Sequence, residues 1–319
     1  MNRLSLCLYR MVITIAITVL FSTMLSAAPL AEFINYKAAD GANLNALLYL
    51  PDKPGSSVVI LIPGGTGGFI DGFHDYTPLA EQLTEKGYAF LLANMRTAGT
   101  HGWFYDRFET AEQDVGAAVE MAKARGLNQI ILVGVSLGGP RAVYFWDRTR
   151  EPAIKAIVFL ASITSPYLEG RVRLDATQRA AFDAVLVKAR NLISQGKGHE
   201  PVCFIYFGNV GECSAPGAGL TLSAESFISY LGSPEESNAV SIKFTGQLTL
   251  PAAVIHSAND ELSHPPVARE IYDSLTAAPR RDLIWIEDEG VSHYLTPGKS
   301  ATVYARAVVN WVSEVVPPE

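Results

Sequence analysis

Basic clusters, repeats and low-complexity segments are missing from this sequence, and each absence excludes a class of protein. The 25 lysine and arginine residues form no run and are outnumbered by 32 aspartate and glutamate residues, which gives a net charge of −7. Nucleic acids and anionic membranes attract basic surfaces, so neither is expected as a partner. No repeat has the period of a solenoid, so solenoids are excluded as well.

Long apolar runs are also scarce, and the one that stands out lies near the N-terminus. Residues 11–25 are apolar apart from four hydroxyl side chains, and they follow Arg3 and Arg10. This run is shorter than the roughly 20 residues that a membrane-spanning helix needs. Small residues come next, at 26–28. Basic, then apolar, then small is the order typical of a secretory signal peptide.

We therefore interpret residues 1–28 as a signal peptide and residues 29–319 as the exported domain. Cleavage after Ala28 leaves Pro29 as an unfavourable first mature residue, and an uncleaved membrane anchor is the alternative. Loss of two arginines and no acidic residue leaves 23 basic against 32 acidic residues, a net charge of −9. We expect export to the periplasm or the medium, with no membrane span in the mature protein.

Cysteine is rare, with three residues in the chain. Cys7 lies in the predicted signal peptide, which leaves Cys203 and Cys213 close together in the segment CFIYFGNVGEC. In an oxidising compartment two cysteines this near can pair, so export favours a disulfide between them. Two separate buried thiols are the alternative.

What the chain does contain is enough apolar sequence for a large core, since 49% of its 319 residues are hydrophobic. Short continuous apolar runs alternate with segments of helical periodicity, a pattern that predicts a mostly parallel sheet covered by helices on both faces. The expected strands are 32–38, 45–51, 57–63, 88–96, 129–136, 154–162, 252–257 and 281–287. The expected helices are 74–86, 109–125, 138–148, 175–195, 266–277 and 300–315.

The alternation stops after residue 162 and resumes at residue 252. A structureless loop of that length is improbable, so residues 163–248 are interpreted as an insertion with structure of its own. Its helix 175–195 has an apolar face, and the segment AESFISYLG adds Phe227, Ile228, Tyr230 and Leu231. We expect a partly helical cap, with some of these side chains lining a pocket for an acyl chain.

The expected strand 129–136 ends in GVSLG, residues 134–138. Glycine, any residue, serine, any residue, glycine, placed between a strand and a helix, is typical of a nucleophile elbow that projects the serine above a sheet. The helix that follows directs the positive end of its dipole at the site. Ser136 is therefore the candidate nucleophile, whereas the alternative is an ordinary turn built from small residues.

Three motifs together make residues 32–311 similar to the α/β-hydrolase family. GVSLGG resembles the elbow, and LIPGGTGG after an early strand resembles the oxyanion loop, although Pro63 stands where the family usually has histidine. ANMRTAGTHG resembles a third segment, in which Asn94 replaces the usual aspartate. The resemblance implies a mostly parallel, doubly wound sheet of the α/β-hydrolase type with an inserted cap. It also implies a triad in the chain order serine, acid, histidine.

Chain order then selects the other two members. His293 follows the last expected strand and is the candidate base, whereas the other histidines lie before Ser136, in the insertion, in a strand or at the start of a helix. Asp260 follows the penultimate strand and is the candidate acid. Glu261 and Asp288 are nearby carboxylates that we interpret as solvated loop charges.

The family resemblance also implies an oxyanion hole made from two backbone N–H groups. Leu137, directly after the serine, is expected to supply one, and Gly65 the other, with Thr66 beside it. Arg96 and Asp114 either form a buried pair that stiffens these loops or a surface ion pair worth under about 1 kcal/mol.

The sequence therefore predicts an exported serine hydrolase, of which a carboxylesterase or lipase acting on a small acyl substrate is the preferred form. Thioesters, amides and peptides remain alternatives, because a fold does not fix the bond that is cut. A binding protein on a hydrolase scaffold is a further alternative, against which the intact triad counts. No metal or organic cofactor is implied, and nothing in the sequence indicates an oligomeric state.

Overall fold

The structure is a computed structural model, and it describes residues 31–53, 55–65, 67–69, 74–98, 102–205, 211–213 and 220–319. Residues Ala31–Glu319 form one compact unit. The predicted signal peptide, residues 1–28, lies outside the described residues, as does Thr66. No helix in the described ranges combines the length and the hydropathy that crossing a bilayer requires.

Among the described residues, eight strands form the main sheet in the order β1-β2-β4-β3-β5-β6-β10-β11. Their bounds are β1 (Ala31–Lys37), β2 (Asn43–Tyr49), β3 (Ser57–Ile62), β4 (Ala89–Ala93), β5 (Gln129–Val135), β6 (Ile154–Leu160), β10 (Ala252–Ser257) and β11 (Arg281–Ile286). β2 is antiparallel to both of its neighbours, and the other pairings are parallel. The expected mostly parallel sheet is confirmed.

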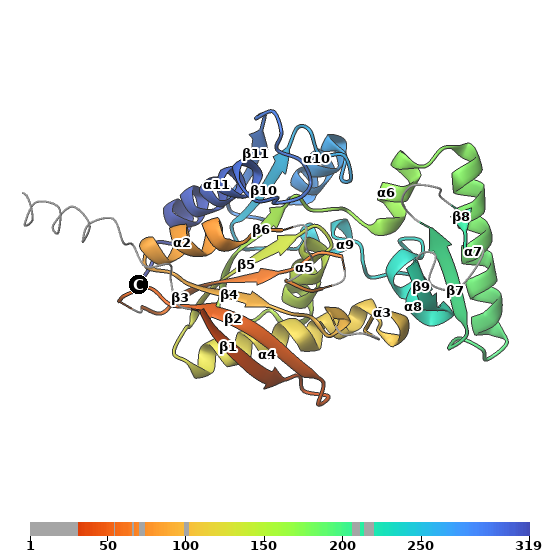
Figure 1. Cartoon of the computed structure of the whole chain (residues 1–319), viewed down its shortest axis with the longest axis horizontal. Helices are drawn as coiled ribbons and strands as arrows, with labels where there is room; N and C mark the ends of the chain where they lie inside the picture. Colours follow the sequence, from red (N-terminus) through yellow and green to blue (C-terminus); the bar gives the residue numbers. More distant parts are fainter. Residues whose placement is uncertain are drawn as a thin grey trace, which may run out of the picture. The chain divides into compact units, whose positions relative to one another are not determined.

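Helices cover both faces of this sheet (Figure 1). One face packs against α4 (Ala111–Ala124), α5 (Gly138–Thr149) and α10 (Pro265–Ser274), and the other against α2 (Thr77–Glu85) and α11 (Lys299–Val315). The central strands β3 and β4 are buried at every position, because both of their faces lie under helices. That burial explains why their sequences are continuous apolar runs.

The first two strands differ from the central ones in sequence and surroundings. β2 alternates between buried and more exposed side chains, since one face packs on the core and the other is more exposed to solvent.

Beyond β4 come a 3₁₀ turn at Arg96–Ala98, the short helix α3 (Gly102–Tyr105) and a second 3₁₀ turn at Phe108–Thr110. These segments lead into α4 and contact β9 and α8 of the insertion described next.

Between β6 and β10 the chain forms the cap, drawn in green to cyan in Figure 1. It contains α6 (Pro166–Arg173), α7 (Ala176–Ser194), β7 (Pro201–Ile205), β8 (Gly211–Glu212), β9 (Leu220–Ser223), α8 (Ala224–Leu231) and α9 (Ile242–Thr245). β8, β7 and β9 make a separate antiparallel sheet. The sequence predicted α7, whose start is fixed by a capping box of Asp175 and Gln178, but not the small sheet.

A disulfide links Cys203 in β7 to Cys213 just after β8, with the two Cα atoms 5.4 Å apart. This is the pairing that the sequence favoured. It closes a hairpin whose strand β8 has only two residues, too few to hold the hairpin by ladder hydrogen bonds alone.

The aromatic side chains of the cap belong to a third hydrophobic cluster, which also includes Phe108, Leu137 and Tyr144 from outside the cap. Phe227 is 0% exposed and Tyr230 is 2% exposed. Phe227 packs on Phe182 of α7, which in turn contacts Phe204 of β7. The suggestion that Phe227 and Tyr230 line an acyl pocket is therefore wrong, because Phe227 is buried against α7 and Tyr230 is buried against Phe108 and Asp106 in the segment that follows β4.

Candidate active site

Ser136 lies in the turn between β5 and α5 with a backbone φ of 51°, a left-handed value that few residues other than glycine adopt. The turn is tight because the chain passes close to itself. A Cβ on Gly134 would be 2.4 Å from the backbone of Gly138, and one on Gly138 would be 2.0 Å from the Ile62 carbonyl oxygen. Glycine is thus required on both sides of the serine, whose own side chain is partly exposed.

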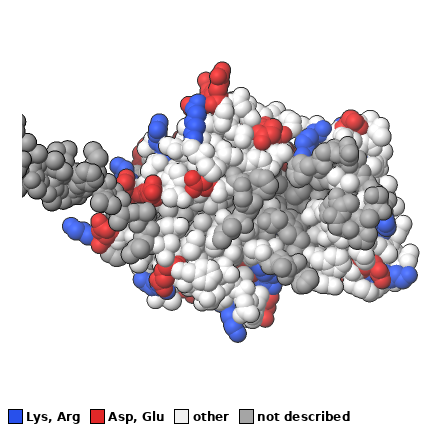
Figure 2. Space-filling model, in the orientation of Figure 1, with Lys and Arg blue, Asp and Glu red and all other residues white. Residues whose placement is uncertain are grey.

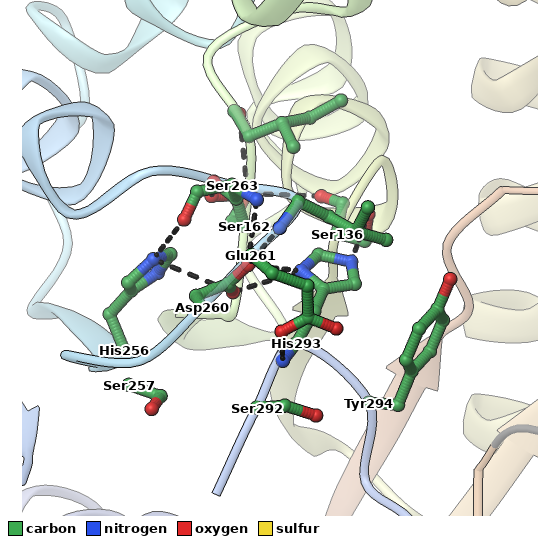
Figure 3. A network of polar contacts seen from close by, with 12 residues as sticks. Ser136, Ser162, His256, Ser257, Asp260, Glu261, Ser263, Ser292, His293 and Tyr294 are labelled. Carbon is green, nitrogen blue, oxygen red and sulfur yellow. Dashed lines mark hydrogen bonds and ion pairs between the residues drawn. The ribbon is translucent and has the colours of Figure 1, made fainter. Parts of the chain in front are cut away.

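The structure brings Ser136, His293 and Asp260 together (Figure 3). His293 Nε2 lies 3.1 Å from Ser136 Oγ, and His293 Nδ1 lies 2.9 Å from Asp260 Oδ2. A carboxylate only accepts hydrogen bonds, so the proton is on Nδ1, and Nε2 accepts from the serine hydroxyl. Ser136 follows β5, Asp260 follows β10 and His293 follows β11, all at the carboxyl ends of their strands.

The Asp260 carboxylate is buried and held by its own loop. Its Oδ1 accepts hydrogen bonds from the backbone N–H groups of Leu262 at 2.9 Å and Ser263 at 2.7 Å. Buried carboxylates need such donors to remain charged. The oxygen that faces His293 is therefore fixed in place before any substrate arrives.

His256, in β10, lies on the other side of Asp260 (Figure 3). Its Nε2 donates to the Ser263 carbonyl at 2.8 Å and is 3.5 Å from Asp260 Oδ2. Burial lowers the pKa of His256, while the Asp260 charge opposes that shift. His256 is the histidine that the sequence placed in a strand, and its ring contacts the acid rather than the serine.

None of the remaining rivals is hydrogen-bonded to the imidazole ring of His293. His264 is the residue before α10, as expected. Glu261 is exposed and accepts a hydrogen bond from the backbone N–H of His293 at 3.3 Å. Asp288 is exposed and pairs with Lys299 at 3.6 Å. Glu261 thus supports the histidine loop, a contact that the interpretation as a free loop charge did not include.

Gly65 and Leu137, the expected oxyanion donors, lie on two segments that meet at Ser136. The loop after β3 touches the serine, since a Cβ on Gly64 would be 2.7 Å from the Ser136 Cβ. Gly65 has a φ of +33°, and Leu137 precedes the first residue of α5. Within the described ranges, neither N–H group donates to another protein group, so both are available to an incoming oxygen.

Arg96 and Asp114 form a partly buried pair, with Asp114 buried and the Arg96 side chain 17% exposed. Asp114 is 1% exposed and accepts from the Arg96 backbone N–H at 2.8 Å and from its Nε at 2.9 Å. Asp40 binds the other side of the guanidinium. Asn94 nearby bonds the Phe69 N–H at 2.8 Å, so this region holds the end of the oxyanion loop.

Glu169, on α6 of the cap, is a buried carboxyl that sequence reasoning missed. It is 3% exposed, and its Oε1 lies 3.5 Å from Ser263 Oγ, next to the loop that holds Asp260. Burial raises the pKa of Glu169 to about 8, and the Asp260 charge adds to the rise. A glutamate with polar neighbours on a short helix is typical of an exposed position. The burial of Glu169 is therefore evident only from the packing of α6 on the loop that carries Asp260.

Replacing Glu169 by glutamine is expected to stabilise the fold increasingly as the pH rises from about 5 to about 8. The folded protein keeps a proton that the unfolded chain loses above its ordinary pKa of 4.5, so wild-type stability falls through this window. Glutamine resembles the protonated form and does not titrate. The gain at pH 8.5 should be on the order of a few kcal/mol, measured from urea midpoints.

The control for that series is Glu225→Gln, which removes an exposed carboxylate from the same cap. Wild type and Glu169→Gln should have similar midpoints at pH 4.5, where both side chains are neutral. A Glu169→Gln midpoint that stays below that of wild type throughout the range would show that the carboxyl is charged and paired in the fold.

Charge outside the site has little pattern. On the face drawn in Figure 2, acidic and basic side chains are interspersed between wide uncharged areas.

In the described part of the chain, no group of three or more histidine, cysteine, aspartate or glutamate residues has the arrangement of a metal site.

Comparison with known proteins supports the fold. Residues 56–195 match the family model described as serine aminopeptidase, S33. No curated protein sequence is similar enough to count as a match. Among solved structures, the esterase domain of a Rhodothermus marinus protein has a TM-score of 0.60 at 16% identity, covering 89% of this chain and 98% of that one.

Two further structures are similar over nearly their whole lengths. An esterase from Pyrococcus furiosus has a TM-score of 0.60 at 16% identity, with 90% of this chain and 91% of that one covered. Est1E from Butyrivibrio proteoclasticus, solved with ferulic acid bound, has a TM-score of 0.63 at 19% identity, with 88% and 98% covered. At these identities the likeness establishes a common fold.

Proposed function

The chain is an α/β-hydrolase by fold, and we propose that it is an exported serine hydrolase that cleaves a carboxylic ester. The observation that carries the proposal is the hydrogen-bonded line from Ser136 Oγ through His293 to Asp260, at 3.1 Å and 2.9 Å. Esterases among the structures of the same fold support the ester as the bond that is cut.

In the proposed reaction Ser136 Oγ attacks the acyl carbonyl while His293 Nε2 takes the hydroxyl proton. Asp260 holds the imidazole in the required tautomer and stabilises the imidazolium, without accepting the proton itself. The carbonyl oxygen becomes an oxyanion that the N–H groups of Gly65 and Leu137 bind.

His293 then gives its proton to the leaving alcohol, and an acyl-enzyme remains on Ser136. A water molecule attacks this ester with the same histidine as base, and the acid is released. The backbone donors and the buried Asp260 carboxylate are already in place, so little reorganisation is needed as charge develops.

A peptidase is the second candidate, and the description of the matching family as a serine aminopeptidase favours it. The same triad acts on amides, whose nitrogen must be protonated as it leaves. A thioesterase or a non-catalytic binding protein on this scaffold has no particular observation in its favour.

A substrate panel tests these candidates. The protein, recovered from the periplasm or medium of an expressing bacterium, is expected to cleave 4-nitrophenyl esters with a higher kcat/KM than matched thioesters or aminoacyl anilides. Mass spectrometry of the same sample reports whether residues 1–28 have been removed. Faster cleavage of anilides would favour the peptidase, no turnover would favour the binding protein, and retention in the cytoplasm at full mass would count against export.

A further inference from the structure

The mechanism above leaves one buried cation without a role. Arg141, in the first turn of α5, is 1% exposed, and its guanidinium points away from solvent toward the loop after β3. Its Nη1 donates to the Pro63 carbonyl at 2.9 Å and lies 3.4 Å from that of Gly64, and its Nη2 lies 3.3 Å from that of Gly65. Three consecutive carbonyls of the oxyanion loop therefore face one guanidinium.

We infer that Arg141 is a positioning residue that orients the oxyanion loop, so that the Gly65 N–H is directed at the oxygen of the substrate. This inference rests on the proposed function. Arg141 acts through the loop backbone and is not expected to touch the substrate.

The geometry of the peptide bond supports this role. In a trans peptide the carbonyl and the N–H of the next residue point in opposite directions. The Gly64 carbonyl and the Gly65 N–H belong to one peptide, so holding the carbonyl on the Arg141 side turns the N–H to the opposite side. Gly67 N–H also donates to the Gly64 carbonyl, at 2.7 Å, and adds to the hold.

The loop needs such an external support because its own sequence provides little. Glycines fill much of the segment GGTGG, and glycine leaves the backbone with more accessible conformations than any other residue. Gly65 and Gly67 both have positive φ, at 33° and 77°. Without a fixed partner, several orientations of the Gly65 N–H would compete with the one that binds an oxyanion.

The charge of Arg141 is balanced from the cap side. Tyr230 of α8 interacts electrostatically with the guanidinium and donates from its hydroxyl to Asp106 Oδ2 at 2.7 Å. Thr110 donates to the other Asp106 oxygen at 2.5 Å. Asp106 is 8% exposed, so cation, phenol and carboxylate form one buried polar chain that runs from the cap to the oxyanion loop.

Arg141→Met tests the inference, since methionine fills much of the same space without donors. We expect kcat on the best 4-nitrophenyl ester of the panel to fall by about 10 to 100-fold, somewhat less than the loss of a whole oxyanion donor. KM should change little, because a ground-state carbonyl depends less on this donor. Affinity for a trifluoromethyl ketone with the same acyl group, which forms an anionic adduct on the serine, should fall by the same factor as kcat/KM.

A readout independent of activity follows the loop itself. Amide hydrogen exchange of the peptide that contains residues 63–69 should become faster in Arg141→Met than in wild type. Arg148→Met, an exposed arginine of the same helix paired with Glu112, is the matched control and should leave kinetics and exchange unchanged. Arg141→Lys, which reaches one carbonyl instead of three, should lie between wild type and the methionine variant.

Wild-type kcat in Arg141→Met, or a lower kcat with unchanged ketone affinity, would overturn the role in oxyanion binding. Unchanged loop exchange would overturn the hold on the loop. If Arg141→Met does not fold, Arg141→Lys decides, and wild-type kcat in that variant contradicts the inference. A wild-type protein that forms no acyl-enzyme contradicts the proposed function and the inference together, whereas the other results leave the proposed function standing.

Discussion

Ser136→Ala is expected to lower kcat for ester hydrolysis on the order of 10⁶-fold, leaving only the residual rate enhancement that the oxyanion donors and substrate binding supply. No other described hydroxyl is hydrogen-bonded to His293 Nε2, so no side chain is placed to take over the attack. The melting temperature should stay within a few degrees of wild type, because the lost oxygen is partly exposed and packs little. Hydrolysis and thermal melting are measured on the same preparation.

The control is Ser194→Ala, at an exposed position near the end of α7 that is remote from the triad in the fold. It should retain both activity and melting temperature. Ser136→Ala is purified by the same procedure as wild type, so any hydrolysis by a contaminating host enzyme appears as residual activity in that preparation. Turnover by Ser136→Ala at the wild-type rate would rule out the serine mechanism.

His293→Ala and Asp260→Asn are each expected to lower kcat by several orders of magnitude, and the double variant should be barely worse than His293→Ala alone. Members of a triad act as a unit, so their effects do not add. Asparagine presents an amide to Nδ1, which favours the wrong imidazole tautomer and removes the charge that stabilises the imidazolium. The measurement is kcat for both single variants and the double variant on one ester.

Glu261→Gln and Asp288→Asn are the matched carboxylate controls in the neighbouring loops. Among the described residues, the Glu261 carboxylate is hydrogen-bonded to the backbone N–H of His293 alone, at 3.3 Å, so its replacement should change kcat by less than about tenfold. If Glu261→Gln were the crippling change and Asp260→Asn the mild one, the acid would have been assigned to the wrong residue. Additive losses in the double variant would mean that the two residues act separately.

Much of the main sheet was predictable because the residue pattern of each strand reflects how that strand is buried. Strands such as β3 and β4 are buried on both faces, so they are nearly continuous apolar runs between glycine-rich or helical segments. The cap was harder to predict. β7 alternates in burial and pairs with strands of two and four residues, and such short pieces carry too little pattern to separate from loops.

In the candidate site, too, some residues could be predicted from the sequence and others could not. Ser136, Asp260 and His293 follow from chain order, because the carboxyl ends of parallel strands meet at one edge. Glu169 and Arg141 depend on contacts between elements far apart in sequence, and nothing in their local sequence indicates burial. Their roles are set by which backbone oxygens and carboxylates the folded chain places around them.

The contacts of α8 bear on whether caps can be exchanged between enzymes of this fold. Ser226 donates to the Phe104 carbonyl at 3.0 Å, Ser229 to Glu109 at 2.9 Å and Tyr230 to Asp106 at 2.7 Å, all in the connector that follows β4. A chimera with a foreign cap between β6 and β10 would leave these acceptors without their hydrogen-bond donors. It would also break the chain of polar contacts from Asp106 through Tyr230 to Arg141. A chimera therefore has to transfer residues 104–110 together with the cap, although about 50 residues of sheet and helix separate the two segments along the chain.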